Sequence, residues 1–200
     1  MKQQKNRTKG QRVKRLLLLT TLMLVVLAGC GKRENSQTTE VAVTDSAQLL
    51  NLVWEQFADT ERFSAMGGDF SNPVDNGAGI FNIEDTENLT YMLYIPEQNV
   101  GMIDEAASLI HAMNTNTFTA AAFHLKDDAD TGALAEALKE NILNTQWICG
   151  IPDELAIYII NGEYVVSAFG NAEIMATFKT KLSNVFGGGE ILFTEEKITE

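Results

Sequence analysis

The residues of this chain with the most reactive side chains are its two cysteines, and one of them follows a distinctive N-terminal segment. Cys30 comes directly after Leu27-Ala28-Gly29. Seven lysines and arginines and no acid lie within the first 15 residues, and a mostly apolar run of about 12 residues follows, which is typical of a secretory signal. That run is shorter than the roughly 20 residues that a membrane-spanning helix needs.

The stretch 27–30 resembles the lipobox of bacterial lipoproteins. The resemblance implies that Cys30 receives a diacylglyceryl thioether, that residues 1–29 are removed as a signal peptide, and that Cys30 becomes the mature N-terminus. The protein would then be anchored by acyl chains such as palmitate to the extracytoplasmic face of the cell membrane. Two alternatives stay open, namely an ordinary signal peptide cut nearby and an uncleaved short anchor.

The net charge argues against two kinds of partner, nucleic acids and anionic lipid headgroups. Removing residues 1–29 takes away seven of the 15 cations and none of the 27 acids, so the remaining 171 residues carry a net charge of about −19. Nucleic acids and anionic lipid headgroups bind clustered Lys and Arg, so such a domain repels both. We therefore expect no nucleic-acid partner, and a membrane contact made by lipid on Cys30, because two acyl chains anchor a protein stably.

The second cysteine, Cys149, has few means of activation. If Cys30 is lipidated, Cys149 has no partner for an intramolecular disulfide, a CxxC pair or a zinc site. It follows a predicted helix whose C-terminal end disfavours a thiolate. We expect it to be structural and slow to react.

The two histidines, His111 and His124, lack the spacing of a zinc motif. We expect His111 on the polar side of a helix near Asp104 and Ser108, in contact with solvent. We expect His124 at the end of a strand, packed on the same face as small alanines.

Acidic residues open two further possibilities. Asp128, Asp130 and Gly132 resemble the start of an EF-hand loop, but Lys139 stands where a calcium-binding loop needs a bidentate Glu. Helix capping is the preferred interpretation of these aspartates. We therefore expect no metal and no cofactor. Paired carboxylates for glycoside hydrolysis are a weaker alternative, because acids are abundant and their separations are unknown.

Periodicity and turn signals predict the elements that position these residues. Asp45 is expected to cap the first helix, Asp85 the second, and the glycine-rich stretch 64–79, with four glycines, to form a long loop. The Asn161-Gly162 pair predicts a type I′ turn between two strands that form the centre of the core. The expected helices are 46–62, 85–94, 102–113, 131–145 and 172–186, and the expected strands are 117–125, 155–160, 163–169 and 190–194.

These elements predict an α+β fold, with a small, mostly antiparallel sheet, helices packed on one face and an additional helical N-terminal portion. We expect a lipid-anchored flexible tether over 30–44 and a single α+β domain over 45–200. The apolar stripe of the last helix should place Phe178 against the sheet.

The second half of the chain is similar to a family of short bacterial lipoproteins known as a domain of unknown function. The shared features lie within 85–186 and include the strand ending at Lys126-Asp127, the corner 147–152 and the strand beginning Glu163-Tyr164-Val165-Val166. The resemblance implies a secreted, lipid-anchored α+β domain. It carries over no catalytic residue.

Together these observations favour a membrane-anchored envelope lipoprotein with a non-enzymatic binding or scaffolding role toward an unknown envelope protein or ligand. The alternative is a small envelope hydrolase that uses acidic residues or Cys149. A transport-linked solute receptor is disfavoured because 171 residues are few for a two-lobed clamp.

Overall fold

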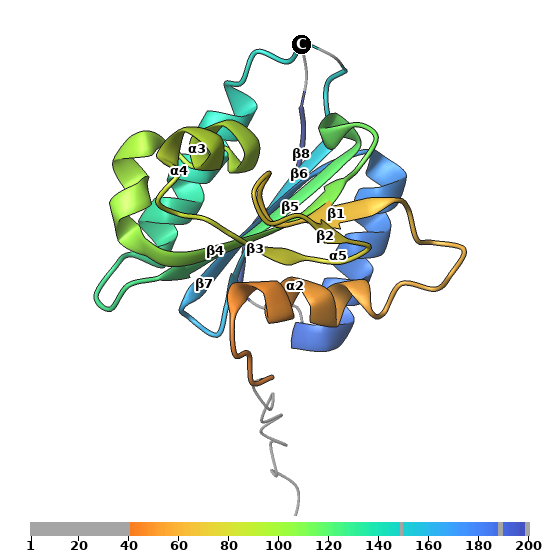
Figure 1. Ribbon diagram of the computed structural model, residues 1–200, viewed down its shortest axis with the longest axis horizontal. Helices are drawn as coiled ribbons and strands as arrows, with labels where there is room; N and C mark the ends of the chain where they lie inside the picture. Colours follow the sequence, from red (N-terminus) through yellow and green to blue (C-terminus); the bar gives the residue numbers. More distant parts are fainter. Residues whose placement is uncertain (1–40, 149, 188–189, 199–200) are drawn as a thin grey trace, which may run out of the picture. The chain divides into compact units, whose positions relative to one another are not determined.

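The computed structural model of this protein describes residues 41–148, 150–187 and 190–198. An eight-stranded antiparallel sheet lies at its centre, with helices packed against it (Figure 1). The helices are α2 (Ser46–Trp54), α3 (Thr86–Leu93), α4 (Thr131–Leu143) and α5 (Ala172–Phe186), with 3₁₀ turns η1 (Glu97–Met102) and η2 (Thr115–Thr117). The strands are β1 (Ala65–Gly67), β2 (Val74–Asp75), β3 (Gly79–Phe81), β4 (Ile103–His111), β5 (Phe118–Leu125), β6 (Glu154–Ile160), β7 (Tyr164–Gly170) and β8 (Glu190–Lys197).

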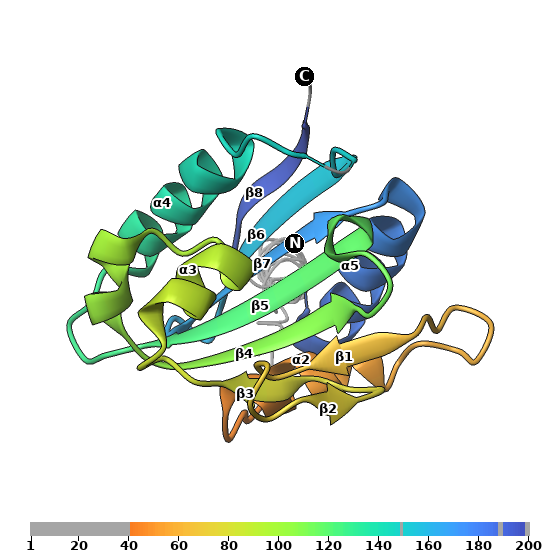
Figure 2. The same cartoon turned by 45° about the horizontal axis from the view of Figure 1, so that its top comes forward.

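The predicted α+β class is confirmed. The strand order is β2-β1-β4-β5-β7-β6-β8, and β3 pairs with β4 beside β1. Helices cover both faces, whereas we expected them on one: α2 and α5 share one apolar cluster, and α3 and α4 share another (Figure 2). Successive residues of the central strands enter alternate clusters, so both faces of these strands are buried.

The hairpin of β6 and β7 is the part of the sheet that the sequence predicts best. Asn161 and Gly162 have φ angles of 53° and 75°, as a type I′ turn requires. Ile160 pairs with Tyr164 directly across this turn. Because β7 lies between β5 and β6, the hairpin occupies a central position, as predicted.

Three of the predicted helices are confirmed, and two of them have the predicted N-cap. Asp85 caps α3, Asp130 caps α4, and α5 has the predicted bounds 172–186. The helix that begins after Asp45 is capped as expected, since the Asp45 side chain accepts the Gln48 N–H at 2.7 Å. It ends at Trp54, earlier than expected, because the next residues form tight turns.

The predicted helix 102–113 is wrong, because this segment forms β4. Both faces of β4 are packed: Ala106 and Ile110 enter the α3/α4 cluster, and Ala107 and Leu109 enter the α2/α5 cluster. A strand buried on both faces has apolar residues at consecutive positions, which also fit a helical stripe.

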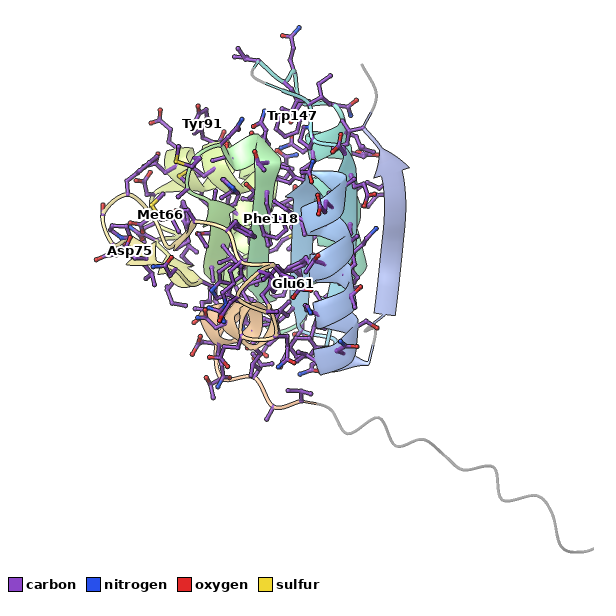
Figure 3. The ribbon with its side chains drawn as sticks, turned by 90° about the vertical axis from the view of Figure 1, so that its right-hand side faces the viewer. Glu61, Met66, Asp75, Tyr91, Phe118 and Trp147 are labelled. Carbon is purple, nitrogen blue, oxygen red and sulfur yellow. The ribbon has the colours of Figure 1, made fainter. Side chains whose placement is uncertain are left out.

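The predicted loop 64–79 is wrong in part, because it contains the short strands β1 and β2 and the start of β3. Met66 pairs with Asp75 across β1 and β2 (Figure 3). Gly67 is required there, because a Cβ atom on it would lie 2.3 Å from the backbone nitrogen of Gly79. The glycines therefore permit a close approach of two backbones, and not only a flexible loop.

Candidate functional site

A cluster of titratable side chains surrounds His124 at the end of β5. Its Nδ1 lies 2.5 Å from an Asp104 carboxylate oxygen, and its Nε2 lies 3.9 Å from a Glu163 carboxylate oxygen. The ring packs against Tyr164, with centroids 4.8 Å apart. The register of the sheet produces this cluster, because β4, β5 and β7 are neighbours.

The electrostatics of this cluster are dominated by acids. Burial raises the pKa of Tyr164 to about 12, and the nearby carboxylates of Glu163, Glu105, Asp45 and Asp104 add to the shift. The phenol therefore stays protonated at neutral pH and is a poor nucleophile. The Asp104 and Glu163 side chains are 48% and 54% exposed, so the carboxylates that contact His124 lie at the protein surface.

His111 does not lie where we expected it. It ends β4 and stacks on Phe63, with ring centroids 5.1 Å apart and an interplanar angle of 16°. Its Nδ1 accepts the Met113 N–H. Asp104 contacts His124 instead, and Ser108 is buried and donates to the Gly68 carbonyl, because the segment is a strand and not a helix.

Of the acids before α4, Asp130 caps the helix as expected, whereas Asp128 lies in a turn with a φ of 66°. The Asp130 side chain accepts the Ala133 N–H at 3.0 Å, which satisfies a free backbone donor of the first turn. Within the described residues, no group of three or more His, Cys, Asp or Glu side chains is arranged to hold a metal ion.

Cys30 and Cys149 lie outside the described residues, so their predicted roles stay predictions. The described part of the corner that precedes Cys149 packs against the core through Trp147. Its ring lies 5.2 Å from that of Tyr94 and 5.4 Å from that of Phe169, measured between centroids.

A second candidate site is a groove between α3, η1 and α4, with a volume of about 420 Å³. This volume lies within the range of small-molecule sites, about 300–1,000 Å³. The groove combines carboxylate, amide and hydroxyl side chains with a smaller apolar part, and the described residues that line it include no cation. The lining residues are Thr90, Ile95, Pro96, Glu97, Gln98, Ala137, Glu140, Asn141 and Asn144.

Local structure fixes the wall of the groove. Tyr94 adopts a left-handed conformation, with φ 59°, which ends α3 and turns the chain toward η1. The Asn141 side-chain amide donates to the Tyr94 carbonyl at 2.7 Å, which ties α4 to this turn and leaves the Asn141 side-chain oxygen as an acceptor. Sequence reasoning missed the groove, because its two helices are separated by more than 35 residues.

We compared the chain with models of protein families, with curated proteins and with solved structures, and none of them matched. The helices that the structure describes include none with both the length and the apolar character needed to cross a bilayer.

Proposed function

We propose that this protein is a lipid-anchored binding domain of the cell envelope, without catalytic activity, held through Cys30 at the extracytoplasmic face of the cell membrane. The observation that carries the proposal is the Leu-Ala-Gly-Cys motif at 27–30, placed directly after a basic and then apolar segment. The groove between α3, η1 and α4 supports a binding role, since the described residues that line it offer hydrogen-bonding side chains and include no nucleophilic thiol or imidazole.

The described end of the tether supports a lipid anchor over an electrostatic one. The Val41 carbonyl accepts a hydrogen bond from the Asn161 side chain at 2.9 Å, so the chain enters the domain beside the turn of the β6–β7 hairpin. The acids around Tyr164, the strand residue next to this turn, are Asp45, Asp104, Glu105 and Glu163. Their charge repels anionic headgroups, so retention at the membrane has to come from acyl chains.

The test compares Cys30→Ser with Cys149→Ser in cells fed a clickable fatty acid. We expect Cys30→Ser to lose both the label and membrane retention, and Cys149→Ser to keep both, because only Cys30 lies in the motif. Label on the Cys30→Ser protein, or a mature N-terminus mapped to another residue, would overturn the proposal.

A small envelope hydrolase is the second candidate, favoured by the position of His124 between the Asp104 and Glu163 carboxylates. If the parent protein hydrolyses a chromogenic ester, peptide or glycoside and the His124→Gln variant does not, the hydrolase proposal replaces the first one. Fast alkylation of native Cys149 by iodoacetamide, with a pH midpoint well below about 8.5, would do the same for a thiol mechanism.

A further inference from the structure

We infer that the groove between α3, η1 and α4 binds a short neutral saccharide. The inference deepens the proposed function and rests on it, because it names the ligand class of a binding domain in a glycan-containing envelope. The two can fail separately, since membrane retention depends on Cys30 and saccharide binding depends on the groove.

The lining of the groove matches the surface of a sugar ring. A pyranose presents apolar C–H faces and a rim of hydroxyl groups, each of which both donates and accepts hydrogen bonds. Pro96 and Ala137 supply apolar surface, and the fully buried Ile95 packs beneath them. Carboxylates and amides supply polar groups around it, from Glu97, Gln98, Glu140, Asn141 and Asn144.

The polar groups are also balanced for hydroxyl ligands. Glu97 and Glu140 only accept when ionised, whereas the amides of Gln98 and Asn144 both donate and accept. Asn141 presents an acceptor, because its amide nitrogen is bound to the Tyr94 carbonyl. A ligand with many hydroxyl groups can satisfy donors and acceptors together.

Charge discriminates against the two other classes of small polar ligand. An anion is repelled by Glu97 and Glu140, which no cation within the lining offsets. A simple organic cation is attracted, but both carboxylates are exposed to solvent, where an ion pair contributes only about 0–1 kcal/mol. Directed hydrogen bonds and apolar contact therefore have to supply the affinity, and a saccharide offers both.

The test uses the lipidated full-length protein in a detergent without sugar groups. The probes are maltose and N,N′-diacetylchitobiose as neutral saccharides, spermidine as a cation and inorganic phosphate as an anion. Binding is followed through the side-chain amide resonances of Gln98, Asn141 and Asn144. The groove variant is Glu140→Gln with Asn144→Ala. The matched control is Glu55→Gln, directly after α2, with Asn184→Ala in α5, because both helices belong to the opposite face.

We expect at least one disaccharide to shift these amide resonances, the groove variant to bind it at least tenfold more weakly, and the control variant to bind it normally. Melting curves verify that both variants are folded. Co-sedimentation with purified wall glycan would then identify a polymer as the source of the sugar, and disaccharide binding without co-sedimentation a free sugar.

Three results would overturn the inference. The first is that neither disaccharide binds at millimolar concentration. The second is that the groove variant and the control variant bind equally well. The third is that spermidine or phosphate, and not a saccharide, shifts the groove resonances.

Discussion

The sheet centre, formed by β5, β7 and β6, and the sheet margin, formed by β1, β2 and β3, are stabilised in different ways. Every residue of β7 is buried, and its side chains enter apolar clusters on both faces. The margin is short and rich in glycine. Its strands expose Ile80 by 45% and Val74 by 40%, and the β1–β2 connection exposes Phe70 by 66%. The margin therefore buries less apolar surface than the centre does.

In the margin, polar contacts compensate for the smaller burial of apolar surface. The Asp69 side chain is buried and accepts the backbone N–H groups of Ser71, Asn72 and Asn82, at 2.7, 2.9 and 2.9 Å. These bonds join the β1–β2 connection to the end of β3. The comparison teaches that apolar burial dominates in the centre, whereas the margin depends more on polar contacts, among them those of Asp69, and on close glycine contacts. The margin should therefore open without the centre.

The largest loss of stability is expected from Phe178→Ala in α5. Phe178 is fully buried, and its ring lies 5.2 Å from that of Phe118 on β5, between centroids. Loss of the ring leaves a cavity and should lower the free energy of unfolding by about 3–5 kcal/mol. Urea denaturation measures this free energy of unfolding. The control is Thr180→Ala, because Thr180 is exposed. Lys179 is less suitable as a control, because its ammonium pairs with the Glu154 carboxylate at 2.8 Å. Equal midpoints for the two variants would show that α5 does not dock in this way.

A smaller loss of stability is expected from Gly67→Ala in β1. The new methyl group would lie 2.3 Å from the Gly79 nitrogen and 2.4 Å from the Gly77 carbonyl oxygen, so the backbone has to shift. Overpacking of this kind costs about 1–3 kcal/mol. Gly101→Ala is the control, because no atom lies within 4 Å of its added Cβ. In the Gly67→Ala protein, backbone chemical shifts should change in the margin and stay constant in β6 and β7. Changes in the β6–β7 hairpin would contradict the claim that the margin opens independently of the centre.

The smallest effect, and one that depends on pH, is expected from Asp69→Asn. Burial raises the pKa of Asp69, but the three backbone N–H groups outweigh it and hold the pKa below its usual value. The carboxylate therefore stabilises the fold above the unfolded pKa of about 3.9, and this contribution is lost as the pH falls through the folded pKa. A charged acceptor is stronger than a neutral one, so the variant should lose about 1–2 kcal/mol at pH 7.

Urea unfolding of the parent protein and the Asp69→Asn variant at pH 7 and pH 3 measures this dependence. The difference in stability between the two proteins should shrink at pH 3, which lies below the unfolded pKa of about 3.9, because the unfolded state of the parent protein is protonated there. An equal difference at both pH values would show that the charge of Asp69 does not stabilise the margin.

The sequence predicts best those elements that residues close together in the chain determine. The Asn161-Gly162 turn, the N-cap of α4 at Asp130 and the apolar stripe of α5 are set by residues close in the chain, and the structure has all three. The sequence pattern of β4 predicts a helix wrongly, because burial on both faces removes the alternation that marks a strand.

The candidate sites depend on contacts that local signals do not contain. The glycines of β1–β3 suggest a loop until the partner backbone is known. Glu163 reaches His124 only because β7 pairs with β5, and the groove forms only when α3 meets α4. The signal at Cys30 lies outside the described residues and stays a prediction for the lipidation experiment.

Native-state hydrogen exchange tests the separation of centre and margin most directly. Amides of β5, β6 and β7 should exchange only through global unfolding, with the full free energy of unfolding. Amides of β1, β2 and β3 should exchange through a smaller opening, with a lower free energy and a weaker dependence on urea. The same free energy and the same urea dependence in both regions would contradict the account.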